Sequence, residues 1–366
     1  MSYITSIGTA SPENCFKQES IADFMVKAMR LNNTDERKLR ALYRATGIET
    51  RCSVLPDYGK SKDFELYPND ESLNFPSTRQ RMELFKKFAP ALSVAAVQNC
   101  LDKIPFLQNS EITHLIVVSC TGLYAPGLDI DLVKLLELKT SVQRTCINFM
   151  GCYAAFNALK LANTICESEA NAKVLVVCTE LCSLHFQHEI TDDNLLANAL
   201  FADGSAALVI ESTPRKGINV KPLSFYCDLA FNGEDAMAWK VGDLGFEMKL
   251  SSYVPEVIRD GIKSLTQSLL GKMEKKILEV DFFAIHPGGK KILEVIESEL
   301  ALSKNQNRYS YEVLRKHGNM SSPTVIFVLN ELLTQLTSED DAKTILSFAF
   351  GPGLTLESML LTVESH

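Results

Sequence analysis

The sequence of 366 residues lacks several features that would place it in other classes of protein. No apolar run approaches the roughly 20 residues that a membrane-spanning helix needs, so we expect no membrane insertion. The N-terminus shows no basic region followed by a long apolar core, so we expect no signal peptide. Positive charge is not in excess, because the formal net charge is -8. This balance argues against nucleic acid or an anionic membrane as the main partner.

Metal-binding and disulfide patterns are also missing. None of the ten cysteines forms a Cys-x-x-Cys pair, and Cys178 and Cys182 have no second cluster of ligand-type spacing. Structural zinc and a disulfide framework are therefore disfavoured. We expect no metal site and a reducing, cytoplasmic location.

What is present is an alternation of apolar strands and helices. Strands are predicted over 3–7, 115–119, 144–149, 173–178, 206–210, 282–285, 344–350 and 356–363, and helices over 20–31, 34–44, 79–101, 128–138, 153–166, 255–272, 290–302 and 323–336. The pattern is typical of an α/β fold. The strand ending at Ser119-Cys120-Thr121-Gly122 resembles the one ending at Ile285-His286-Pro287-Gly288. This similarity predicts a duplicated α/β unit with halves 1–214 and 215–366.

The stretch Asn148-Phe149-Met150-Gly151-Cys152 is the first candidate for chemistry. A Gly followed by a Cys at a strand-to-helix junction places the sulfur at a helix N-terminus, where free N–H groups favour negative charge. Cys152 could therefore be a thiolate nucleophile at neutral pH. Taken alone, a cysteine in an apolar helix is more often a buried structural residue.

Two glycine-flanked loops supply further candidates. His286 follows a predicted strand, where α/β folds place their sites, and Gly288 and Gly289 would let backbone approach a ligand closely. Asn319 lies in a loop before a helix and could by itself be only a turn residue. A Cys, a His and an Asn suffice for acyl transfer with carbon–carbon bond formation. The thiolate takes the acyl group, and the His and Asn donate hydrogen bonds to the thioester oxygen.

A row of arginines follows one face of the predicted helix 34–44. Arg37, Arg40 and Arg44 recur at i, i+3 and i+7. The row is either a solvated helix face or an anion clamp for a phosphate-bearing ligand.

Motifs along almost the whole chain resemble those of the type III polyketide synthases, the chalcone synthase-like enzymes of the thiolase fold. They are Gly8-Thr-Ala-Ser-Pro12, His114 to Gly122 with Ala125-Pro-Gly127, Leu200-Phe-Ala-Asp-Gly-Ser-Ala-Ala207 and Phe348-Ala-Phe-Gly-Pro-Gly-Leu354. The resemblance implies a duplicated, five-layered αβαβα architecture and a homodimer. It also implies acyl-CoA and malonyl-CoA as substrates, with no metal or organic cofactor.

The resemblance also assigns roles to single residues. The catalytic residues are Cys152, His286 and Asn319. The CoA-binding residues are Arg37, Arg40 and Arg44 with the backbone of Gly288 and Gly289, and the substrate-pocket residues are Cys120, Ala125, His185, Phe201, Met248 and Ser321.

Three positions depart from the family pattern. Met248 replaces a gating phenylalanine, for which Phe246 could substitute. Ala125 stands where plant members use a Met that reaches across the dimer. Ala349 replaces a glycine, at a cost of about 1 kcal/mol if that position needs a positive φ.

The implied activity has three steps. An acyl-CoA starter loads on Cys152, decarboxylative condensation with malonyl-CoA extends it, and the polyketide cyclises. The segment around Cys152 is most similar to bacterial members that make alkylpyrones or alkylresorcinols from fatty acyl-CoA. The alternatives are a ketoacyl synthase of fatty-acid synthesis that uses acyl carrier protein, and a non-catalytic CoA-binding protein of the thiolase fold.

Overall fold

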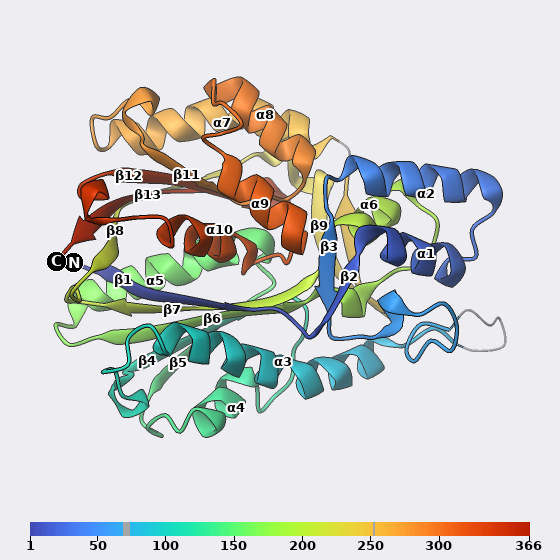
Figure 1. Cartoon of the computed structure of the whole chain (residues 1–366), viewed down its shortest axis with the longest axis horizontal. Helices are drawn as coiled ribbons and strands as arrows, with labels where there is room; N and C mark the ends of the chain where they lie inside the picture. The colour runs from blue at the N-terminus through green and yellow to red at the C-terminus, as the bar shows by residue number, and fades with distance from the viewer. Residues whose placement is uncertain (69–73, 252) are drawn as a thin grey trace.

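The body of the molecule is one continuous sheet folded into two stacked layers, with helices between the layers and on both outer sides (Figure 1). The computed structural model describes residues 1–68, 74–251 and 253–366. The helices of the three helical layers are α3 (Thr78–Leu101) and α4 (Leu128–Leu135) below, α5 (Ala154–Ser168) and α10 (Thr324–Leu333) in the middle, and α7 (Val254–Gly271) and α8 (Lys290–Leu300) above. The predicted α/β fold with five αβαβα layers is confirmed.

The strand order of the second half repeats that of the first. Neighbouring strands run β4, β6, β7, β1 in one set and β11, β12, β13, β8 in the other. In both sets the first pair is parallel and the next two pairs are antiparallel. Strand β5 pairs with the outer side of β4, and the two sets meet at the pair Ile4 and Val220. The strand bounds are β1 (Tyr3–Ala10), β4 (His114–Ser119), β5 (Gln143–Asn148), β6 (Lys173–Leu181), β7 (Asp203–Glu211), β8 (Ile218–Leu229), β11 (Phe282–Ile285), β12 (Thr344–Gly351) and β13 (Thr355–Ser365).

Most strands are buried on both faces, which explains why they read as continuous apolar runs, whereas β5 is largely exposed and β8 is only partly buried. In β6, Val174 and Val176 belong to the core around α5 and α10, whereas Leu175 and Val177 belong to the core around α3. In β12, Ile345 and Ala349 belong to the middle core, whereas Leu346 and Phe348 belong to the core around α7. None of the described helices combines the length and the apolar character that a membrane crossing requires.

A smaller group of elements lies at one end of the layers, on the right in Figure 1. It contains α1 (Gln18–Ala28), α2 (Asn33–Ala45), α6 (Asp192–Leu200), β2 (Asn14–Lys17), β3 (Thr50–Ser53) and β9 (Met237–Gly242), which pairs with β10 (Gly245–Leu250). The sequence pattern predicted α1 and α2 but not the short strands or α6. These elements surround the site described below.

The cysteine prediction needs one correction. Cys15 and Cys52 form a disulfide, and the other eight cysteines are free. The two residues lie directly opposite each other on the antiparallel strands β2 and β3. Residues in such a pair have neighbouring side chains. Their separation of 37 residues in the chain gave no sign of this proximity.

Ala349 carries no backbone penalty. It is fully buried within β12 and has no positive φ. The residues of this motif with positive φ are Gly353, at +72°, and Leu354, at +45°. The condition under which Ala349 would cost stability is therefore not met.

Candidate active site

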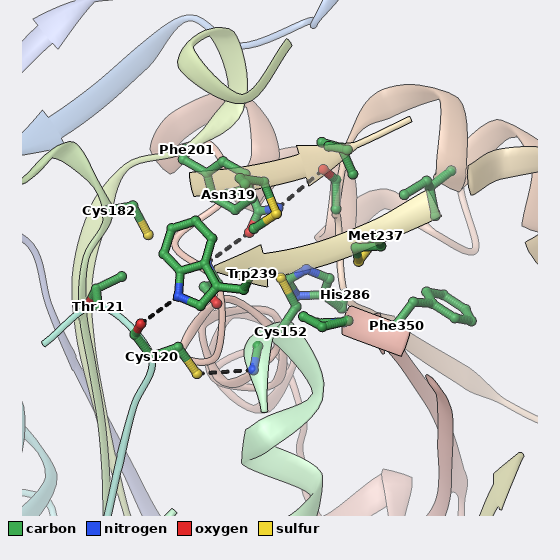
Figure 2. A pocket seen from close by; sticks show the side chains of 17 residues that line it. Cys120, Thr121, Cys152, Cys182, Phe201, Met237, Trp239, His286, Asn319 and Phe350 are labelled. Atoms are coloured by element: carbon green, nitrogen blue, oxygen red, sulfur yellow. Dashed lines mark hydrogen bonds between the residues drawn. The ribbon is translucent and has the colours of Figure 1, made fainter. Parts of the chain in front are cut away.

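Three elements from distant parts of the chain meet at one cavity of about 620 Å³, a volume that includes its open mouth (Figure 2). Cys152 comes from the 3-10 helix η3 (Gly151–Tyr153), between β5 and α5. His286 follows β11 directly, and Asn319 lies in the loop after α9 (Arg308–His317). The structure thus brings the three predicted catalytic residues together.

The turn that presents Cys152 requires a glycine before it. Gly151 has φ +74°, a conformation that other residues adopt only at a cost. A Cβ on Gly151 would also overlap the ring of Pro352 from the second half of the chain. Helix α5 begins two residues after Cys152, so the sulfur lies near the helix N-terminus as predicted.

Burial opposes the charged forms of both reactive groups. It raises the pKa of the Cys152 thiol to about 12, although hydrogen bonds with Ser321 and Asn319 act in the opposite direction. Burial lowers the pKa of the His286 imidazole to about 3. Desolvation therefore outweighs the helix field that favoured a thiolate. At neutral pH the site holds a thiol and a neutral imidazole.

The ring nitrogens of His286 are buried, and neither has a hydrogen-bond partner among the described residues. The backbone of His286 is fixed in position, because its N–H donates a hydrogen bond of 2.8 Å to the carbonyl of Phe348 in β12. An unpaired polar group in the interior costs free energy. A substrate that enters the cavity would supply the missing partner.

The side-chain amide of Asn319 has a fixed orientation. Its oxygen accepts a hydrogen bond from the N–H of Ser321 at 2.8 Å, and its nitrogen donates to the carbonyl of Gly288 at 3.2 Å. Backbone hydrogen bonds to Leu200 and Ala202 hold the residue itself. Because an amide nitrogen has two hydrogens, the one not donated to Gly288 is directed to the Cys152 sulfur or to a ligand beside it.

The chain matches the N-terminal domain of chalcone and stilbene synthases over residues 1–214 and their C-terminal domain over residues 226–364. The chain belongs to the chalcone and stilbene synthase family. It is a type III polyketide synthase, an acyltransferase that joins acyl units by decarboxylative Claisen condensation, and it has the thiolase-like fold of that family. Enzymes of this family use acyl-CoA and malonyl-CoA.

Similar proteins come from bacteria, a slime mould and an alga. The α-pyrone synthesis polyketide synthase-like Pks18 of Mycobacterium tuberculosis is 34% identical, over 98% of this chain and 91% of its own length. The type III domain of Steely1 from Dictyostelium superposes with a TM-score of 0.89 at 30% identity, covering 99% of both chains. PKS-I of the brown alga Ectocarpus siliculosus gives a TM-score of 0.88 at 30% identity, covering 99% of this chain and 98% of its own.

Four of the predicted pocket residues of the synthase line the catalytic cavity: Cys120, Phe201, Met248 and Ser321. His185 lines an adjacent chamber instead. Its Nε2 donates to the carbonyl of Thr121 at 2.7 Å and its Nδ1 accepts from the N–H of Phe246 at 2.9 Å. Burial lowers the pKa of His185 to about 3, so this residue is neutral.

Two further positions lie outside the cavity. Ala125 is exposed on the loop after β4 and lines no part of the cavity in its own chain. Phe246 does not replace the gating phenylalanine, because it is buried against His185 with the rings stacked 4.3 Å apart. The residues of β10 that line the cavity are Met248 and Leu250.

Sequence reasoning missed two residues that shape the site. Trp239, the single tryptophan of the chain, lines the cavity and donates from Nε1 to the carbonyl of Cys120 at 2.7 Å. Glu180 is fully buried and accepts hydrogen bonds from the Cys120 N–H and from the hydroxyls of Thr121 and Ser322. It connects the loop after β4 to the loop of Asn319. The signal for Glu180 was a lone carboxylate in an otherwise apolar strand.

A surface groove of about 1810 Å³ adjoins the cavity, since Gly288, Leu250 and Ile292 line both. Gly289 lines the groove as well, and the role of the two glycines in binding CoA stays a prediction. Among the described residues, no group of three or more His, Cys, Asp or Glu is arranged to hold a metal ion.

The arginine row does not line this groove. Lys38, Leu42 and Ala45 are the residues of α2 that do. Arg40 points toward α1, where it pairs with Asp23 at 2.7 Å, and it also pairs with Glu36 at 2.8 Å. Arg37 and Arg44 are exposed on the same side of the helix as Arg40. The basic residues at the groove are Lys38, Lys290 and Lys291.

The raised pKa of Cys152 predicts how its reactivity depends on pH. A thiol whose pKa lies above the assay range gains thiolate as pH rises, about tenfold per pH unit. We therefore expect the rate of Cys152 alkylation by iodoacetamide to climb steadily between about pH 6 and pH 9. Peptide mass spectrometry would measure the alkylated fraction of Cys152 at each pH. The exposed Cys146 in the same digest serves as the reference for the reactivity of iodoacetamide. A rate independent of pH over this range would instead mean a preformed thiolate–imidazolium pair.

Proposed function

We propose that this synthase loads an aliphatic acyl group on Cys152, extends it with malonyl-CoA and closes the product to an α-pyrone. The observation that supports the chemistry is one cavity holding a buried thiol, an imidazole with unpaired nitrogens and an amide of fixed orientation. The name of the similar mycobacterial protein refers to α-pyrone synthesis, which supports the product class.

In the loading step, His286 acts as a neutral base at the moment of attack. A ring nitrogen takes the proton of the Cys152 thiol while the sulfur attacks the carbonyl of the acyl-CoA. The carbon–sulfur bond to CoA then breaks, and the CoA sulfur takes the proton from the imidazolium. The acyl group is left on Cys152 and the imidazole is neutral again.

In the extension step, His286 and Asn319 donate hydrogen bonds to the carbonyl oxygen of malonyl-CoA. Loss of CO₂ leaves its electron pair as an enolate, whose oxygen carries the negative charge that the two donors stabilise. The enolate carbon attacks the acyl group on Cys152. The new carbon–carbon bond forms as the bond to sulfur breaks, and Cys152 takes up a proton.

The cavity lining favours an aliphatic starter. Met237, Met248, Leu250 and Phe350 form much of the wall around the reactive residues. Such a surface binds methylene groups through the hydrophobic effect and offers a charged chain no partner. An alkylresorcinol is the second product class that an aliphatic starter could give, and product analysis separates the two.

The test is product analysis with labelled malonyl-CoA and a series of saturated acyl-CoA starters. We expect alkylpyrones from the wild-type protein. Asn319→Ala should lower malonyl-CoA decarboxylation about 10² to 10³-fold, because one donor to the enolate oxygen is lost. Acylation of Cys152 should persist in this variant, and Asn305→Ala, at an exposed asparagine, is the matched control. Absence of product from every acyl-CoA, or full decarboxylation by Asn319→Ala, would contradict the proposal.

We also propose that Lys38, Lys290 and Lys291 bind the phosphates of CoA at the groove. Lys290 and Lys291 open helix α8, whose N-terminus favours anions in addition to their own charge. Lys38 lies across the groove on α2, where it pairs with Asp192 at 2.5 Å. A phosphate would compete for this exposed lysine.

For Lys291→Ala we expect KM for malonyl-CoA to rise about three- to tenfold while kcat stays near its starting value. The corresponding N-acetylcysteamine thioester, which lacks the phosphates, should show no change in KM. The effect should shrink as salt rises, because exposed charges are screened. Arg40→Ala decides between the lysines and the arginines. If KM for CoA substrates rises in Arg40→Ala and not in Lys291→Ala, the arginine row binds the phosphates instead.

We propose a homodimer as the working state of the synthase. Strand β5 lies at the edge of its sheet, and most of its side chains are exposed. Open edges of this kind invite pairing with another strand. Ala125 on its exposed loop could then contact the partner subunit. We expect light scattering to give twice the mass of the 366-residue chain at micromolar concentration, and the mass of one chain would contradict this.

A further inference from the structure

Arg51 is a cation buried in the interior, and none of its hydrogen-bond partners among the described residues is a carboxylate. The residue lies in β3 and is 1% exposed. Its Nε donates to Oε1 of Gln18 at 2.8 Å, and its Nη1 donates to the carbonyls of Asn198 at 2.9 Å and of Phe201 at 2.5 Å. Within the described part of the chain, Nη2 has no partner. Because a buried charge without compensation is costly, another source of negative charge must offset it.

The C-terminus of helix α6 supplies this negative charge. The last carbonyls of an α-helix have no partner within the helix, and the aligned peptide dipoles give this end a partial negative charge. In α6, each carbonyl of residues 198–201 accepts a hydrogen bond from another element. The donors are Arg51 to carbonyls 198 and 201, the Tyr43 hydroxyl to 198, the Gln18 amide to 199 and the Asn319 N–H to 200. Arg51 is therefore the cationic cap of α6.

The capped end of α6 leads directly into the active site. Phe201 follows the helix and forms an isolated β-bridge with Asn319. Two backbone hydrogen bonds of 2.9 Å make this bridge, because the Asn319 N–H donates to Leu200 and the Ala202 N–H donates to Asn319. Both Phe201 and Asn319 line the catalytic cavity (Figure 2). The position of Asn319 thus depends on the backbone that Arg51 caps.

Arg51 contacts both sides of this bridge without lining the cavity itself. Its guanidinium holds the carbonyl of Phe201. Its stem lies against Gly318, the residue before Asn319, because a Cβ there would come within 2.9 Å of both Cγ and Cδ of the arginine. A planar guanidinium donates several hydrogen bonds in fixed directions, which an ammonium does not.

We propose that Arg51 is a positioning residue for the extension step. It fixes the end of α6 and, through the β-bridge, the amide of Asn319 that stabilises the enolate. The inference rests on the proposed function, in which that amide donates to the oxygen of malonyl-CoA. A displacement of about 1 Å in such a site can cost about 10²-fold in rate. The loading step should be affected much less, because none of the hydrogen bonds of Arg51 reaches η3, which carries Cys152.

The first test compares the two steps in wild type and in Arg51→Met. Methionine keeps an apolar stem against Gly318 but donates no hydrogen bond. The kcat for malonyl-CoA decarboxylation should fall about 10- to 100-fold. KM for malonyl-CoA and the rate of Cys152 acylation should stay within about threefold of wild type. An equal fall in acylation and decarboxylation would mean a general loss of structure and would overturn the proposal.

Three further variants control for stability and for charge. Leu269→Ala removes a fully buried side chain of α7 that does not line the cavity, so it should lower the melting temperature without changing the ratio of the two rates. Arg51→Lys keeps the charge but cannot hold both carbonyls of α6 with one nitrogen, so its decarboxylation rate should lie between those of wild type and Arg51→Met.

The third variant, Tyr43→Phe, removes one donor to the carbonyl of Asn198 and keeps the ring beside Arg51. Decarboxylation should fall about two- to fivefold, the worth of one hydrogen bond. An unchanged ratio of the two rates in Arg51→Met would overturn the proposal. If Arg51→Met does not fold, an unchanged ratio in Tyr43→Phe would overturn it.

A double variant shows whether Arg51 acts through Asn319. Residues that act as one unit have effects that do not add. In the Asn319→Ala background, Arg51→Met should therefore lower decarboxylation by less than about twofold beyond Asn319→Ala alone. Two losses that multiply would overturn the positioning role.

Amide hydrogen exchange separates this proposal from the proposed function, because it needs no turnover. The N–H groups of Asn319 and Ala202 form the bridge, so they should exchange about tenfold faster in Arg51→Met than in wild type or Leu269→Ala. Unchanged exchange at both amides would overturn the inference about Arg51. Full decarboxylation by Asn319→Ala would instead overturn the proposed function, and the exchange rates would still decide whether Arg51 fixes this loop.

Discussion

The geometry of the site depends on strand β12, which supports both reactive side chains. At its middle, the carbonyl of Phe348 accepts the backbone N–H of His286. Immediately after the strand, Pro352 lies against Gly151, with no room for a Cβ between them. Cys152 of the first half and His286 of the second half are therefore positioned by the same strand. A shift of β12 would disturb the placement of both Cys152 and His286.

Burial decides the protonation states in this site. The surroundings that exclude water raise the pKa of Cys152 and lower that of His286, so the resting pair is uncharged. A neutral imidazole can accept a proton during loading and donate a hydrogen bond during extension. Farther out, the lysines lie at the groove, and the apolar wall with Trp239 lies inside. Charge thus decreases inward, in the same order as along a CoA thioester from its phosphates to its acyl chain.

Much of the layered fold could be predicted because its strands are buried on both faces and its helices are amphipathic or apolar. Strands such as β6 and β12 then read as continuous apolar runs, and the alternation with helices indicates the α/β class. Several strands that lack a continuous apolar run were not predicted. In β8, Pro222 interrupts the pattern, and a register shift in the pairing with β13 accommodates it. The disulfide between Cys15 and Cys52 depends on the pairing of two short strands, which is not a local property of either segment.

The sequence by itself determined which residues could react, because Cys152, His286 and Asn319 each lie in a glycine-flanked turn at the end of an element, and such turns are local. Only the tertiary structure decided what surrounds them. The helical period fixed that the arginines of α2 share a face, but packing against α1 turned that face away from the groove and left Lys38 there. Likewise, Trp239 reaches the cavity only because β9 and β10 cross it. Packing sets which way a helix face is turned and which distant segments lie side by side, and a local sequence pattern does not encode either.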